Sequence, residues 1–175
     1  MATSLIHQAN NTLAIWLAQL EKDAFIIANI RNHEIALMRE TDSAIYDMHH
    51  KILKRHMGSI GSPSFGICQV LAAEMTSLAY ETRICSFQWK QPFDDAVKNI
   101  THYKKELETC SDERRAATIL KRSTEYYDTA KQCLKDAINA IELANSVASR
   151  FFSKVCTVDA EVRHRLSQLP TYGCQ

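Results

Sequence analysis

Residues 71–107 read LAAEMTSLAYETRICSFQWKQPFDDAVKNITHYKKEL, and this stretch decides the predicted fold. Apolar or small residues recur in it at steps of three and four, which is the spacing of one face of a helix. The members of this stripe are Leu71, Met75, Leu78, Thr82, Cys85, Trp89, Pro92, Ala96, Ile100, Tyr103 and Leu107. A proline in a helix interior costs about 3 kcal/mol, yet the phase of the stripe barely changes across Pro92. The pattern therefore predicts one helix that is kinked at Pro92.

A long helix is expected before this stretch, over residues 12–56. Apolar residues recur there at every seventh position, which is typical of a helix that packs along its whole length. Examples are Leu13, Leu20 and Ile27, and then Ile30, Leu37 and Ala44. Asn11 or Thr12 is the expected N-cap. The segment MGSIGSPSFG (57–66) holds three of the four glycines, so a helix-to-helix turn is expected next.

A third long helix is expected after the polar segment ETCSDERR (108–115). Ser111 is the predicted N-cap, with acidic residues well placed in the first turn, although a helix continuous with the preceding one is an alternative. The apolar stripe that follows extends from Ala116 to Leu166. No strand pattern and no internal repeat accompany these helices. The predicted fold is all-α, an elongated antiparallel bundle of three long helices with the second kinked at Pro92. We expect residues 1–169 to form one domain and residues 170–175 a C-terminal tail.

Composition excludes several classes of function. The chain has 175 residues, 46% hydrophobic and 23% charged, with a net charge of +1, so we expect no nucleic-acid partner. No apolar run approaches 18 residues, so no transmembrane segment is expected. The N-terminus lacks the pattern of a signal peptide, and the six cysteines show no metal-binding spacing. We therefore expect a cytoplasmic protein with reduced thiols, and an elongated shape that favours a homodimer.

The stretch SLAYETRICSFQWKQPFDDAVKNITHYKKEL (77–107) resembles the second helix of the BAR superfamily of membrane-curvature proteins. The similarity rests on a leucine and a tyrosine, then a proline with a bulky apolar residue, then several lysines. These residues are Leu78, Tyr80, Pro92, Phe93, Lys98, Lys104 and Lys105. The segment STEYYDTAKQCL (123–134) is similar to a tyrosine–aspartate segment common in BAR helices. MRETD (38–42) and its spacing to Pro92 look most like the ciliary Chibby-interacting subfamily, with the sorting-nexin subfamily nearly as close.

The resemblance implies three long kinked helices per chain, a curved dimer and binding to curved membranes. This chain is shorter and less basic than usual BAR domains. A cluster of basic residues supplies the expected membrane-binding site, and we call it the basic cluster. Its members are Lys98, Lys104, Lys105, Arg114, Arg115, Lys121 and Arg122. Four acidic residues lie among these seven cations, which leaves a local excess of +3. The alternative is an ordinary solvated helix face with i,i+4 ion pairs.

Other candidate segments favour structural roles. HHKILKRH (49–56) is basic, but its histidines lack the i,i+4 spacing of helical zinc motifs, so no metal site is expected. The glycine-rich segment 57–66 follows a helix and lacks the phosphate-binding loop pattern. MATSLIHQA (1–9) could insert into a membrane as a short amphipathic helix, but a frayed or docked first turn is the preferred interpretation.

No catalytic residues and no cofactor are predicted, because no nucleophile–base arrangement can be identified in the sequence. The leading hypothesis is a non-enzymatic dimeric module, peripheral to membranes, that senses curvature on anionic phospholipid and also binds partner proteins. The alternative is an elongated helical scaffold or adaptor subunit of a cytosolic complex, without lipid binding.

Overall fold

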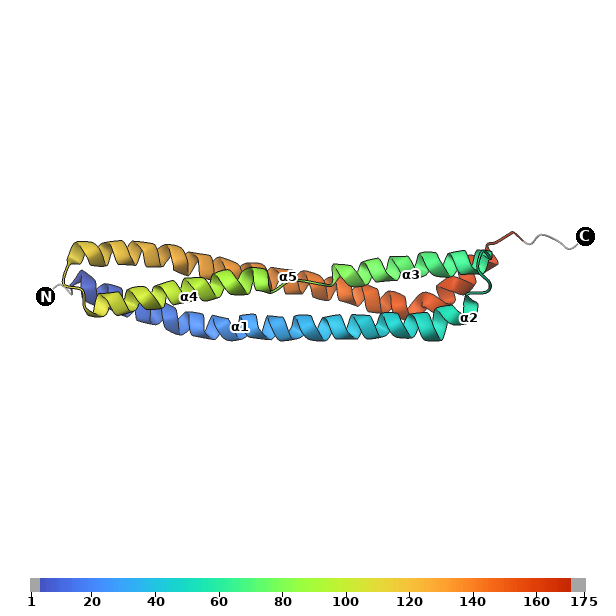
Figure 1. Ribbon diagram of the computed structural model, residues 1–175, viewed down its shortest axis with the longest axis horizontal. Helices are drawn as coiled ribbons and strands as arrows, with labels where there is room; N and C mark the ends of the chain where they lie inside the picture. The colour runs from blue at the N-terminus through green and yellow to red at the C-terminus, as the bar shows by residue number, and fades with distance from the viewer. Residues whose placement is uncertain (1–3, 171–175) are drawn as a thin grey trace, which may run out of the picture. The chain divides into compact units, whose positions relative to one another are not determined.

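The computed structural model describes residues 4–170, and within them it is helical with short connections (Figure 1). Its elements are α1 (Leu5–Asp47), the π-helical segment η1 (Met48–Leu53), α2 (Lys54–His56), α3 (Pro63–Glu81), α4 (Phe87–Glu108) and α5 (Glu113–Ser167). No strand occurs among the described residues. The predicted all-α class is therefore confirmed.

Helix α1 begins at Leu5, earlier than predicted. The Ser4 hydroxyl accepts a hydrogen bond from the backbone N–H of His7 at 3.2 Å, and the Ser4 carbonyl accepts one from Gln8 at 3.0 Å. Ser4 is thus the N-cap, and the predicted cap at Asn11 or Thr12 is wrong. The physical reason is burial: Ala9 is fully buried in the adjacent core, which keeps the preceding turn helical.

The first helical stretch changes its winding near its end. In η1 the N–H of Lys54 bonds to the carbonyl of His49, five residues earlier. Met48 and Leu53 are also five residues apart, and both are fully buried in one core cluster. An α-helix would turn side chains at that spacing away from each other, whereas the wider π turn brings them to the same face. The heptad pattern contains no signal of this local change.

The predicted turn over 57–66 is confirmed between Met57 and Ser62. Gly58 and Gly61 have φ of 60° and 85°, the left-handed region that glycine adopts without a steric penalty. Ser62 then caps α3 by accepting a hydrogen bond from the N–H of Phe65 at 3.2 Å, and Pro63 occupies the first helical position. These residues explain why the chain reverses here.

The prediction of one helix over residues 71–107 is wrong. Helix α3 ends at Glu81 and α4 begins at Phe87, so residues 82–86 interrupt the stripe. The Thr82 hydroxyl donates to the carbonyl of Ala79 at 2.7 Å, which satisfies a backbone group at the end of α3. The Ser86 carbonyl accepts bonds from the first turn of α4. Thr82 and Cys85 keep the spacing of the stripe and so hide the interruption, but Cys85 is exposed and its neighbour Ser86 is the buried residue.

Pro92 lies inside α4, and the helix continues through it. The kink predicted at Pro92 therefore concerns α4 alone and stays a prediction.

A separate third helix is confirmed, and the alternative of a continuous helix is wrong. Helix α5 follows a short turn over residues 109–112. Its N-cap is Asp112 and not the predicted Ser111: the Asp112 carboxylate accepts a hydrogen bond from the N–H of Arg114 at 2.9 Å, and its carbonyl accepts one from Ala116 at 3.0 Å. A carboxylate at this position also interacts favourably with the helix dipole.

The described residues divide into two compact units. Unit 1 comprises residues 4–33 and 85–141, and unit 2 comprises residues 34–84 and 142–170. The single domain predicted over 1–169 stays a prediction. Of the predicted tail, residues 171–175 lie outside the described residues.

Each unit has its own hydrophobic core. In unit 1, α1, α4 and the first half of α5 lie alongside one another, and the core includes Leu13, Leu20, Phe93, Ile100 and Ile119 (Figure 1). In unit 2, η1, α3 and the second half of α5 supply the core, which includes Leu53, Cys68, Met75, Phe151 and Val162. The stripes read from the sequence are thus the buried faces of these helices.

One buried polar atom in α5 gives a test of this packing. The Ser123 hydroxyl is buried and has no hydrogen-bond partner among the described residues. Replacing Ser123 by alanine removes the cost of that unpaired group and should stabilise the protein by about 1 kcal/mol in urea unfolding. Ser146→Ala, at an exposed position of α5, is the control for helix propensity and should give a gain below ~0.5 kcal/mol. Equal gains for the two variants would contradict the assignment.

Candidate functional site

All seven residues of the basic cluster lie in unit 1, on α4 and α5 to either side of the turn over residues 109–112. Three of them make contacts within the unit. Arg115 forms an ion pair with Glu106, with 2.5 Å from its terminal nitrogen to Oε1, and so joins α5 to α4. Lys104 pairs with Glu108 at 3.0 Å, one turn along α4.

Arg122 lies 3.5 Å from the Tyr103 hydroxyl, and this hydrogen bond is the main cause of the raised pKa of its guanidinium.

The other four cations have no ion-pair partner within the described residues. Lys98 and Lys105 are exposed on α4, and Arg114 and Lys121 are exposed on α5. Lys98 and Lys105 are seven residues apart, and so are Arg114 and Lys121. This spacing places the two residues two turns apart on one face of their helix. We call these four residues the unpaired cations. They are the part of the cluster that can receive an anion from outside.

The two unpaired cations of α5 lie off the face of that helix that contacts α4. Arg115 and Arg122 contact α4, and the residue before each of them, Arg114 or Lys121, is rotated about 100° away from that contact. Lys98 borders a shallow groove between α4 and the α1 residues Leu17 and Glu21. The sequence could not show that contacts within unit 1 divide the seven predicted cations into three paired and four unpaired residues.

A second group of contacts in unit 1 was missed by the sequence interpretation. Lys131 of α5 lies 2.6 Å from the carboxylate of Asp23 on α1, and this hydrogen bond raises the pKa of the lysine. Trp16 stacks on Tyr127 with ring centroids 4.6 Å apart, and the Tyr127 hydroxyl donates to Gln19 at 2.5 Å. The segment that resembles a BAR tyrosine–aspartate motif is therefore a packing element between α1 and α5.

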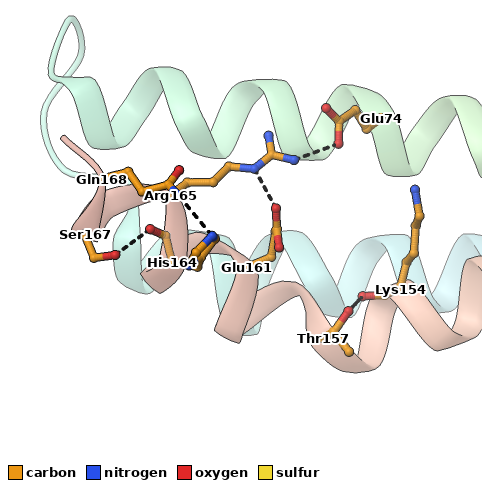
Figure 2. Close-up of polar contacts among 8 residues, drawn as sticks. All are labelled: Glu74, Lys154, Thr157, Glu161, His164, Arg165, Ser167 and Gln168. Atoms are coloured by element: carbon orange, nitrogen blue, oxygen red, sulfur yellow. Dashed lines mark hydrogen bonds and ion pairs between the residues drawn. The ribbon is translucent and has the colours of Figure 1, made fainter.

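Unit 2 contains a polar groove between α3 and α5, with a volume of about 210 Å³. Its apolar lining residues include Leu71, Met75 and Val158. Arg165 bridges the two helices, since its guanidinium lies 3.3 Å from Glu74 and 2.8 Å from Glu161 (Figure 2). Lys154 also lines the groove, so two cations balance the two carboxylates and the groove has the character of a structural contact.

One histidine of the tract HHKILKRH (49–56) forms a hydrogen bond with a carboxylate of α5. His56 Nε2 lies 2.7 Å from the carboxylate of Asp159 on α5, and Arg163 contacts the other carboxylate oxygen. No group of three or more metal-ligating side chains occurs among residues 4–170. The tract therefore helps to hold the end of the first helical stretch against α5.

The N-terminal segment is docked where the structure describes it. Residues 1–3 lie outside the described residues, but Ile6 and Ala9 pack in the core of unit 1. The preferred interpretation of MATSLIHQA (1–9) was a frayed or docked first turn, and the described part of it, residues 4–9, is docked. Across the described part of the chain, no helix has the length and apolarity needed to cross a bilayer. Its five cysteines, Cys68, Cys85, Cys110, Cys133 and Cys156, are free thiols, and burial raises the pKa of Cys68 and Cys133.

Comparisons with known proteins give no relative. The chain matches no protein-family model, no curated protein and no solved structure.

The contact between His56 and Asp159 in unit 2 is expected to be sensitive to acid. The hydrogen bond with His56 lowers the pKa of Asp159 below its ordinary value of 3.8. The Asp159 carboxyl therefore loses its proton at a lower pH in the folded state than in the unfolded state. The resulting stabilisation is fully present above pH 3.8 and is lost as the pH falls through the folded-state value. Asp159→Asn should therefore destabilise the protein near neutral pH, and its difference from wild type should shrink in acid.

Urea unfolding measured at successively lower pH checks this expectation. Asp128→Asn changes an exposed carboxyl on the same helix and is the control for net charge. A difference between Asp159→Asn and wild type that persists unchanged in acid would rule out the proposed contact.

Proposed function

We propose that this protein is a non-enzymatic helical module that binds anionic phospholipid membranes through the unpaired cations of α4 and α5. The observation that carries the proposal is the exposure of Lys98, Lys105, Arg114 and Lys121 without ion-pair partners in the described residues. Long, exposed cationic side chains can reach lipid phosphates while their helices stay packed in unit 1. Lys104, Arg115 and Arg122 make contacts within unit 1, so their role in this proposal is mainly structural.

Magnitudes indicate how such a module would work. A basic side chain near an anionic leaflet contributes about 1 kcal/mol, so four of them give about 4 kcal/mol and a dissociation constant near ~1 mM. One copy would therefore bind weakly and reversibly. Two linked copies would double the number of cations, and their avidity would be far higher. The expected homodimer is thus part of the proposal, because useful affinity requires it.

The finer predictions belong to the same proposal. They are an elongated antiparallel three-helix arrangement like that of BAR domains, a bend at Pro92, a preference for curved membranes and a cytoplasmic location peripheral to membranes. Curvature sensing follows if the cations lie along a rigid curved surface, because more of them then reach a membrane of matching curvature.

The second candidate function is a helical scaffold or adaptor that binds partner proteins without lipid. It is favoured by large apolar side chains exposed on α1, where Ile15 is 59% and Phe25 is 70% exposed. Exposed apolar surface of this kind marks protein interaction sites. The two functions differ in what the unpaired cations do, and the following experiment separates them.

Charge reversal at the unpaired cations should abolish membrane binding. The triple variant Lys105→Glu, Arg114→Glu, Lys121→Glu loses about 3 kcal/mol of attraction, or more than roughly 100-fold in affinity, and adds repulsion. Co-sedimentation with phosphatidylcholine vesicles that contain phosphatidylserine measures the effect. The matched control, Lys51→Glu, Lys54→Glu, Arg55→Glu, makes the same change in net charge at exposed residues of unit 2. Equal loss in both triple variants, or binding by neither wild type nor variant, would favour the scaffold function.

The bend at Pro92 has its own test. Pro92→Ala restores a helical hydrogen-bond donor and relieves the ring clash, so α4 should straighten without losing helicity. Wild type should bind small vesicles better than large ones at equal lipid, and Pro92→Ala should bind both equally. If both proteins prefer small vesicles to the same degree, Pro92 does not set the curvature preference.

A further inference from the structure

A histidine lies on the exposed side of α4, between two of the unpaired cations. His102 follows Lys98 by four residues and precedes Lys105 by three, so the three side chains are neighbours on one face of the helix. Lys98 and His102 are each two residues from the buried Ile100, and two residues rotate an α-helix by about 200°. This face of α4, where all three side chains are exposed, is therefore directed away from the core of unit 1.

The imidazole of His102 has no charged partner within the described residues. Its ring contacts the ring of Tyr103, with centroids 5.9 Å apart, and it forms no hydrogen bond or ion pair among residues 4–170. His56 differs in this respect, because a carboxylate oxygen of α5 lies 2.7 Å from its ring. The charge of His102 therefore depends on the pH and on the charges that surround it.

The charged groups near His102 on α4 leave it in cationic surroundings. The two lysines lie about one turn away on either side of it. Glu106 lies one turn further along the helix, but Arg115 of α5 forms an ion pair with it. Asp95 lies two turns earlier and accepts a hydrogen bond from an amide side chain. Because like charges one turn apart repel each other, the lysines oppose protonation of the imidazole in the absence of lipid.

Charged residues of the other two helices of unit 1 also border this part of α4. From α5, Arg122 reaches the hydroxyl of Tyr103, the neighbour of His102 in the sequence. From α1, Glu21 lines the shallow groove that Lys98 borders. Neither Arg122 nor Glu21 forms an ion pair or hydrogen bond with the imidazole. A counter-charge for a protonated His102 would therefore have to come from outside unit 1, as it does at an anionic lipid surface.

We propose that His102 is a fifth contact residue of the membrane-binding surface, and that its protonation strengthens membrane binding as the pH falls. The inference deepens the proposed function and rests on it, because Lys98 and Lys105 must hold this face of α4 against anionic lipid. Histidine side chains gain a proton between about pH 8 and pH 5. The protonated imidazole adds one cation between the two lysines, and lipid phosphates offset the repulsion that opposes it in the free protein.

The expected gain in affinity is modest. One added cation near an anionic leaflet should increase the affinity of each copy about 5-fold, which corresponds to about 1 kcal/mol. The sign follows from the charges, since the protonated form carries the additional positive charge and the membrane is negative. The protein would therefore bind the same anionic membrane more tightly in acidified surroundings.

Co-sedimentation with vesicles of phosphatidylcholine and phosphatidylglycerol, at about pH 7.5 and about pH 5.5, tests the inference. Phosphatidylglycerol is chosen because its phosphodiester stays anionic at both pH values. His102→Gln is neutral at both pH values, and His102→Lys is cationic at both. On acidification, wild type should gain about 5-fold more in affinity than either variant does. At about pH 7.5, His102→Lys should bind about 5-fold more tightly than His102→Gln.

His164→Gln is the matched control, because it removes an exposed histidine from α5 in unit 2. It should gain affinity on acidification to the same degree as wild type. Circular dichroism should show equal helicity for all four proteins, since both substituted residues are exposed.

The outcomes separate this inference from the proposed function. Wild type that binds at about pH 7.5 but gains no more on acidification than His102→Gln would overturn the inference and leave the proposed function intact. His102→Lys that binds no more tightly than His102→Gln would do the same, because a positive charge at this position would then have no effect. No binding of wild type at either pH would contradict both.

Discussion

The ion pair between Asp23 and Lys131 is the constraint on which unit 1 depends. The side chain of Asp23 is only 12% exposed, so its carboxylate needs the lysine that lies 2.6 Å away. Loss of one partner of a buried pair destabilises a protein by about 3–5 kcal/mol when the remaining charge is buried completely. The stacked Trp16 and Tyr127 pack the same two helices together. These contacts fix the register and rotation of α1 against α5.

That rotation decides which side chains remain on the surface. With Asp23 directed at α5 and Leu20 in the core, the stripe containing Phe25 must face outward. On α5, Arg115 reaches Glu106 of α4, and the neighbouring Arg114 is turned away from that contact and exposed. Unit 1 is thereby left with two kinds of surface, a largely apolar stripe on α1 and unpaired cations on α4 and α5. The proposed membrane contact uses the unpaired cations.

The sequence predicted the helices well where the apolar spacing was unbroken. The buried faces of α1 and α5, the turn with Gly58 and Gly61, and the start of a new helix near residue 112 all follow from spacing, glycine conformation and capping chemistry. The interruption at residues 82–86 could not be predicted, because Thr82 and Cys85 both fit the spacing of the stripe, although Cys85 is exposed and Ser86 is the buried residue. The π-helical turn of η1 could not be predicted either, because a single widened turn has no characteristic amino-acid composition.

The candidate site was predictable only as a set of charges. Counting lysines and arginines identified the basic cluster, but the contacts of Arg115 with Glu106 and of Arg122 with Tyr103 join residues 9 and 19 positions apart across a turn. Such contacts depend on how α4 and α5 face each other, which spacing within one helix does not report. The Asp23–Lys131 pair spans 108 positions and was missed for the same reason.

Lysine footprinting by acetylation and mass spectrometry, on the unmodified protein with vesicles, tests the central claim most directly. We expect vesicles containing phosphatidylserine to protect Lys98, Lys105 and Lys121 from acetylation, and pure phosphatidylcholine vesicles to leave them reactive. Lys51 and Lys54 of unit 2 should react equally under both conditions. Equal protection of all five lysines, or no protection of the three in unit 1, would contradict the claim that the unpaired cations of α4 and α5 bind the membrane.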